Sequence, residues 1–104
     1  MNEQKEAIET VITEVCEVLG VDRDLIIDEG GKKHGNKSVW EARQFIIYVL
    51  HVNKKLPIST LSNYFNRHKR YAFRLCEKVR EGMIYQPYYR KIYADLIEKL
   101  PHLE

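Results

Sequence analysis

The sequence predicts an all-α fold, a bundle of five or six helices that forms a single domain over residues 1–104. Apolar residues recur every three or four positions along most of the chain, which is the spacing of a buried helix face. No stretch keeps the period of two that a half-buried strand shows. The 44% of hydrophobic residues is enough for one modest core.

The first helix is expected over residues 3–19, because its apolar residues share one side and glutamates occupy the rest. The apolar side consists of Ile8, Val11, Ile12, Val15, Val18 and Leu19. Gly20 follows the last of them, as is typical of a helix end. Asp22 can then cap a short second helix over residues 23–27.

Residues 29–37 contain three glycines and no apolar residue, which predicts an exposed loop. Ser38 and Glu41 have the spacing of a capping box at the start of a third helix, expected over residues 39–53. From Phe45 to Leu50 that helix is apolar on nearly every side, so we expect it at the centre of the domain.

The second half of the chain predicts three more helices. A short one begins at or just after Pro57, and Asn66 suits the left-handed turn that follows it. The next is expected over residues 67–82 with Gly82 at its end, and Pro87 is well placed to open the last, over residues 87–100.

Charge is strongly segregated along the chain. Residues 1–29 carry two basic and nine acidic residues, for −7, whereas residues 30–80 carry twelve basic and two acidic, for +10. Residues 81–104 sum to −1, so the net charge of +2 conceals the separation. A cationic segment attracts polyanions, and phosphate contacts from Lys and Arg supply most sequence-independent affinity for nucleic acid.

Other classes of protein find little support in the sequence. Cys16 and Cys76 stand on apolar periodic positions without metal-binding spacing, so we expect buried free thiols, as in a reducing cytosol. The longest apolar run is far too short for a membrane span, and no apolar leader segment is present. We find no Ser-His-Asp or Cys-His set with a credible catalytic arrangement in the sequence. We therefore expect a cytoplasmic protein that is not an enzyme, needs no cofactor or metal and has no membrane partner.

Three segments carry a family resemblance: residues 38–50 (SVWEARQFIIYVL), residues 59–65 (STLSNYF) and residues 72–79 (AFRLCEKV). The first is similar to the end of a basic loop and the helix that follows it in one protein family. The second is similar to that family's P-E-I-G-x-x-F segment, and the third to its V-L-H-A-x-x-K-I segment. The chain resembles the C-terminal DNA-binding domain of the bacterial replication initiator DnaA, which belongs to the Trp-repressor-like helix-turn-helix group.

The resemblance implies a helix-turn-helix over roughly residues 57–82, a basic loop over residues 32–37 and binding of double-stranded DNA. It suggests a role in DNA replication, or in the regulation of a phage or mobile element. The family reads its DNA box with G-G-R-D-H-[S/T]-T-V, whereas residues 66–72 here are NRHKRYA. Arg67 matches the signature arginine and the next four residues differ, so we expect little preference for the initiator's own box.

The predicted DNA contacts fall on three segments. Loop lysines would follow phosphates, the third-helix arginine matches one that lies near the minor groove in the family, and the start of the recognition helix would face base edges. These residues are Lys32, Lys33, Lys37, Arg43, Arg67, His68, Lys69, Arg70, Tyr71 and Arg74. The alternatives are solvated loop and helix faces, and for Arg43 a buried stem that pairs with an acid.

Two further interpretations remain open. The chain could be a protein-interaction module that kept the fold and lost DNA binding, with the acidic first helix as its docking surface, or a ligand-gated repressor. Trp40 and the tyrosine cluster are expected to be packing residues, with stacking on single-stranded bases as the alternative. The cluster consists of Tyr85, Tyr88, Tyr89 and Tyr93.

Overall fold

The computed structural model describes residues 2–27, 37–68 and 70–103, and over these ranges the regular structure is entirely helical. Its elements are α1 (Asn2–Leu19), α2 (Arg23–Ile27), α3 (Lys37–Val52), α4 (Ile58–Tyr64), α5 (Tyr71–Tyr85), α6 (Pro87–Lys99) and a final 3-10 turn, η1 (Pro101–Leu103). The predicted all-α class is therefore confirmed for the described part of the chain.

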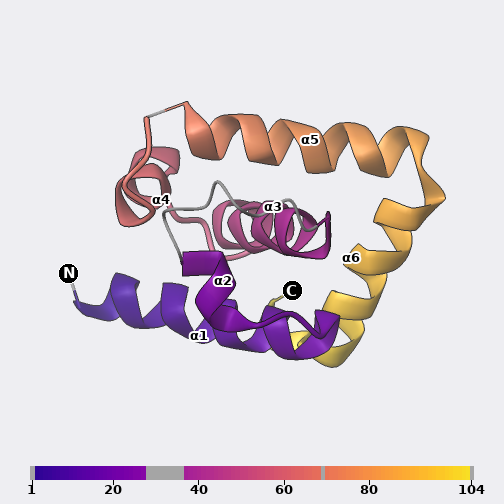
Figure 1. Ribbon diagram of the computed structural model, residues 1–104, viewed down its shortest axis with the longest axis horizontal. Helices are drawn as coiled ribbons and strands as arrows, with labels where there is room; N and C mark the ends of the chain where they lie inside the picture. The colour runs from indigo at the N-terminus through magenta and orange to yellow at the C-terminus, as the bar shows by residue number, and fades with distance from the viewer. Residues whose placement is uncertain (1, 28–36, 69, 104) are drawn as a thin grey trace.

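Helix α3 lies in the middle of the molecule, with α5 on one side of it and α1 on the other (Figure 1). The stretch from Phe45 to Leu50 is buried on every side, as the sequence predicted. Each such side chain stabilises the fold by roughly 1.5–3 kcal/mol relative to an exposed one. Helix α3 is therefore the element around which the others are placed.

Two helix ends predicted from the sequence are confirmed, and both have left-handed backbone. Gly20 has φ +70°, and the next amide, of Val21, donates to the Cys16 carbonyl at 3.0 Å. Asn66 has φ +56° and donates to the Asn63 carbonyl at 2.9 Å. Together with a bond from Arg67 N to Ser62 O at 2.9 Å, this is the Schellman arrangement that closes α4.

The bounds predicted for the fifth helix are wrong at both ends. It begins at Tyr71 rather than residue 67, because His68 forms a turn before it, in which the His68 carbonyl accepts from the Tyr71 amide. It also continues through Gly82 to Tyr85. A Cβ on Gly82 would lie 2.5 Å from Cγ of Tyr89, so this glycine marks a close approach of α6 and not a helix end.

A layer of tyrosines joins α6 to polar groups of α3 and the turn after it. Tyr88 donates to Glu41 Oε1 at 2.8 Å, Tyr89 donates to Gln44 Oε1 at 3.0 Å, and the Tyr93 hydroxyl accepts from Asn53 Nδ2 at 3.1 Å. The Tyr89 ring also lies 5.4 Å from that of Phe45. The packing role predicted for Trp40 and the cluster holds for Tyr89 and Tyr93, whereas Trp40, Tyr85 and Tyr88 are 38%, 77% and 50% exposed.

The capping box predicted at Ser38 and Glu41 does not match the helix start. Helix α3 begins at Lys37, which places Ser38 inside its first turn. The Glu41 carboxylate accepts from Tyr88 and lies 4.0 Å from the Lys37 ammonium. The pair Ser38 and Glu41 therefore located the start of α3 to within two residues. The Glu41 side chain, however, serves the contact with α6.

Candidate nucleic-acid interface

The corner between α4 and α5 is fixed by a buried hydroxyl. Ser62 lies in α4, and its Oγ accepts a hydrogen bond from the backbone amide of Ala72, the second residue of α5, at 3.1 Å. The first amides of a helix have no partner within the helix, so a neighbouring side chain that accepts from one stabilises that end. This contact sets where α5 begins relative to α4.

The turn before α5 is held by His68. Its Nδ1 accepts from the backbone amide of Arg70 at 3.1 Å, and its carbonyl accepts from the amide of Tyr71 at 2.9 Å. Because Nδ1 accepts, the proton of the neutral ring resides on Nε2. The exposed imidazole of His68 therefore presents a donor to solvent from a fixed position.

Three exposed arginines gather at this turn and in the first turn of α5. Arg67 lies with its guanidinium carbon 5.2 Å from the centre of the Tyr71 ring, a cation–π contact. Among the described residues, no carboxylate forms an ion pair with Arg67, Arg70 or Arg74. Further along α5 the situation changes, since Arg80 pairs with Glu77 at 3.0 Å.

The predicted contact residues do not all come together. Arg67, His68, Arg70, Tyr71 and Arg74 share the turn and the start of α5. Predicted contacts Lys32, Lys33 and Lys69 lie outside the described residues.

Lys37, the first residue of α3, lies apart from this group. Its ammonium is 4.0 Å from Glu41 and 5.7 Å from the centre of the Tyr88 ring. Tyr88 lies just beyond the C-terminal end of α5, whereas Arg70 precedes its N-terminal end. Because α5 spans about 22 Å, Lys37, which contacts Tyr88, is far from Arg70.

Arg43 serves the interior of the fold. It is only 8% exposed, and its Nη2 donates to the carbonyls of Leu25 at 3.0 Å and Ile26 at 3.1 Å. These carbonyls belong to the last turn of α2 and would otherwise lack helical partners. The structure thus gives the buried alternative for Arg43, with carbonyls in place of an acid, and we leave this residue out of the interface.

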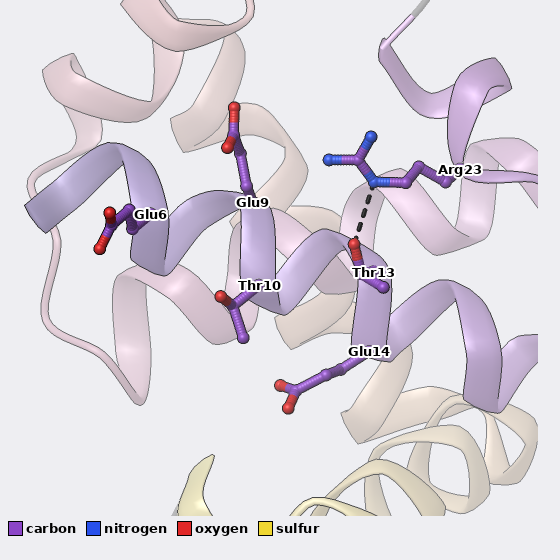
Figure 2. A pocket seen from close by; sticks show the side chains of 6 residues that line it. All are labelled: Glu6, Glu9, Thr10, Thr13, Glu14 and Arg23. Carbon is purple, nitrogen blue, oxygen red and sulfur yellow. Dashed lines mark hydrogen bonds between the residues drawn. The ribbon is translucent and has the colours of Figure 1, made fainter. Parts of the chain in front are cut away.

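The opposite side of the molecule is acidic. An open hollow on α1 is lined by Glu6, Glu9, Thr10, Thr13, Glu14 and Arg23 (Figure 2). Within it, Arg23 Nε donates to Thr13 Oγ1 at 3.0 Å. The hollow offers no nucleophile paired with a base, and the described residues contain no group of three metal-ligating side chains.

The two cysteines are buried free thiols, as predicted. Burial raises the pKa of each thiol to about 11. Because the thiolate is the reactive form, neither Cys16 nor Cys76 has the character of a nucleophile or a metal ligand near neutral pH.

Sequence reasoning missed one residue of this surface. Phe73, the third residue of α5, is 51% exposed. Its place on the helix was available from the sequence, because Ala72, Leu75, Cys76 and Val79 define the buried side and Phe73 lies off it. The predicted contacts were chosen for charge or hydrogen bonding, and Phe73 offers neither.

In the described parts of the chain, no helix combines the length and apolar character needed to cross a membrane. Comparison of the chain with protein-family models, curated proteins and solved structures found no match.

Proposed function

We propose that this domain binds double-stranded DNA, with α4 and α5 acting as a helix-turn-helix and α5 as its recognition helix. The observation that carries the proposal is the set of exposed arginines, without carboxylate partners among the described residues, at the start of α5. The N-terminal residues of a recognition helix are those that face base edges in the major groove.

The side chains differ in what they can contact. Arg70 and Arg74 lie one helical turn apart, and the guanidinium fork matches the O6 and N7 acceptors of guanine. Arg67 is held against Tyr71, which reduces the entropy that it would lose on binding a phosphate. His68 adds a donor at Nε2, and Lys37 is suited to a phosphate further along the duplex.

Backbone amides contribute less to this interface than at other helix starts. The amide of Tyr71 already donates to the His68 carbonyl, and that of Ala72 donates to Ser62 Oγ. Helix N-termini often bind phosphate through such amides. Here two of them are occupied by the fold, so we expect the side chains to make most of the contacts.

The resemblance to the DNA-binding domain of DnaA stays a prediction, as does a role in replication or in a mobile element. It agrees with the placement of the short α4 before α5. The altered signature at residues 66–72 leads us to propose a sequence preference that differs from the initiator's box.

A salt titration tests the proposal. A labelled duplex of random sequence is titrated with the protein at several salt concentrations from about 50 to about 200 mM, with binding followed by fluorescence anisotropy. If the basic surface meets about five phosphates, log K should fall against log salt with a slope of about −4 to −5. Absence of binding at about 50 mM salt by protein that is folded by circular dichroism would refute the proposal.

The second candidate is a protein-interaction module. It is favoured by α1, whose outer side carries five glutamates and a single lysine. Under this alternative, the duplex would not bind even at low salt, while neutralising the glutamates would weaken capture of a basic protein partner. The same titration therefore separates the two functions.

A further inference from the structure

Phe73 lies on the outer side of α5, next to the arginines of the proposed interface. Arg70 has φ −84° and ψ −5°, and its carbonyl accepts from the Arg74 amide at 3.0 Å, so Arg70 continues the helical geometry. Residues three apart on a helix are neighbours on its surface. Phe73 therefore stands beside Arg70 by helical spacing and beside Arg74 in sequence, turned away from the buried face.

Phe73 has no aromatic partner among the described residues. Half of its surface meets solvent, and none of the ring contacts among the described residues involves it. Within the described first two turns of α5, it is the only large apolar side chain that is exposed. The next on this helix is Ile84, 64% exposed and about three turns away.

The major groove of DNA contains one chemical group that can make an apolar contact with the Phe73 ring. The edges of the bases present hydrogen-bond donors and acceptors, except for the 5-methyl group of thymine, which is apolar. An arginine gains from a guanine edge, whereas a phenyl ring gains only from displacing water at that methyl group. The ring and the arginines beside it would then favour different bases at neighbouring positions.

We propose that Phe73 contacts a thymine 5-methyl group in the major groove and selects thymine at that position. The inference rests on the proposed binding of duplex DNA. It adds a specificity-determining residue that makes no ionic contact, so its contribution is independent of salt. Covering one methyl group strengthens binding by about fourfold.

Deoxyuridine tests the contact directly, because it differs from thymidine only by the absence of that methyl group. The probe is a duplex of about 20 base pairs, roughly two turns, made only of A·T pairs in mixed order. Its twin carries deoxyuridine in place of every thymidine. Every docking register of the first duplex presents 5-methyl groups, so the result does not depend on knowing the preferred site.

The wild-type protein should bind the thymidine duplex about fourfold more tightly than its twin at about 50 mM salt. Phe73→Ala should bind both equally, and Phe73→Leu should keep most of the preference. Ile84→Ala is the matched control, since it removes an exposed apolar side chain from the same helix and should leave the preference intact. Because Phe73 and Ile84 are both exposed, each variant should fold, which circular dichroism checks.

Three results would overturn the inference. Equal wild-type affinity for the two duplexes would remove the methyl contact while leaving DNA binding in place. An undiminished preference in Phe73→Ala would assign the contact to another residue. Failure of the wild-type protein to bind either duplex would refute the proposed function, and this inference with it.

Discussion

Helices α1 and α5 pack against opposite sides of α3 and differ in what their outer surfaces carry. Each buries one cysteine and a stripe of aliphatic residues. The outer side of α1 is acidic, and some of its carboxylates are committed within the molecule. Glu9 accepts from Tyr64 at 3.4 Å, and Glu14 contacts His102 Nε2 at 2.9 Å.

The arginines at the start of α5 are not committed in this way among the described residues. A charged side chain that is already paired must lose its partner before it can bind a second molecule. An unpaired side chain loses only bound water on binding. The two surfaces therefore differ in sign and also in pairing, because two of the α1 glutamates have partners within the molecule. The net charge of +2 contains neither distinction.

The largest effect is expected from the double variant Arg70→Ala with Arg74→Ala. Each arginine that reads a guanine contributes about 1–3 kcal/mol, so removing both should weaken binding of a preferred duplex by at least about 1–3 kcal/mol. The matched control is Glu6→Gln with Glu17→Gln on α1, which also removes two charges. With α3 between them, the axes of α1 and α5 are about 16–20 Å apart, beyond the screening length of about 10 Å.

The control should change affinity by less than about twofold, which anisotropy titrations of both variants on the same duplex would resolve. If the glutamate variant altered binding as much as the arginine variant, the difference between the two surfaces would be one of overall charge alone.

Two glycines, Gly82 in α5 and Gly20 just after α1, allow the stability of the two helices to be compared. Gly82→Ala should lower the free energy of unfolding by about 1–3 kcal/mol, because the new methyl group would overlap the Tyr89 ring. Gly20→Ala should cost about 1 kcal/mol for a different reason, since its surroundings are open and only its φ of +70° is unfavourable.

Urea unfolding followed by circular dichroism measures both glycine variants. Truncating the ring should rescue only one of them. Gly82→Ala with Tyr89→Leu should therefore be less destabilised than the sum of the two single changes, and strict additivity would contradict the proposed overlap.

The smallest effect is the pH dependence of stability that comes from the buried cysteines of α1 and α5, and it should be similar for both. The pKa of Cys16 and of Cys76 rises on burial from 9.0 to about 11, so the folded protein keeps protons that the unfolded chain releases. Stability from this source is complete below pH 9 and is lost as the pH rises towards 11. Each thiol should account for about 1 kcal/mol of that loss by about pH 10.

Urea unfolding at a series of pH values, with Cys16→Ala and Cys76→Ala compared against the wild type, isolates this loss from that of the tyrosines. Each variant should remove a similar share of the pH dependence. A dependence that belongs to one cysteine alone would mean that the interiors under α1 and α5 are not equivalent.

Much of the fold followed from local chemistry, which explains where the sequence prediction succeeded. Helices with a clear apolar side were found within a few residues, and the ends at Gly20 and Asn66 were found because left-handed backbone favours those residue types. Gly82 was misassigned because propensity alone cannot show that another helix needs its space.

The candidate site was predictable to a lesser degree. Arg43 and Arg70 are the same residue type in the same basic region, yet one satisfies α2 carbonyls and the other faces solvent. That difference depends on which helices meet, which no local pattern contains. Phe73 was missed for a related reason, since its importance comes from its neighbours on a surface and not from its own chemistry.

The tyrosine layer between α3 and α6 has a consequence for spectroscopy. The pKa values of Tyr48, Tyr64 and Tyr89 are raised chiefly by burial, and that of Tyr88 chiefly by its hydrogen bond to Glu41. Four of the seven tyrosines therefore ionise later in the folded chain than free tyrosine does. Three of them, Tyr48, Tyr88 and Tyr89, lie where α6 meets α3, whereas Tyr64 lies in α4. Because tyrosinate absorbs at longer wavelength than tyrosine, loss of the contact between α6 and α3 should be visible as earlier ionisation of those three tyrosines.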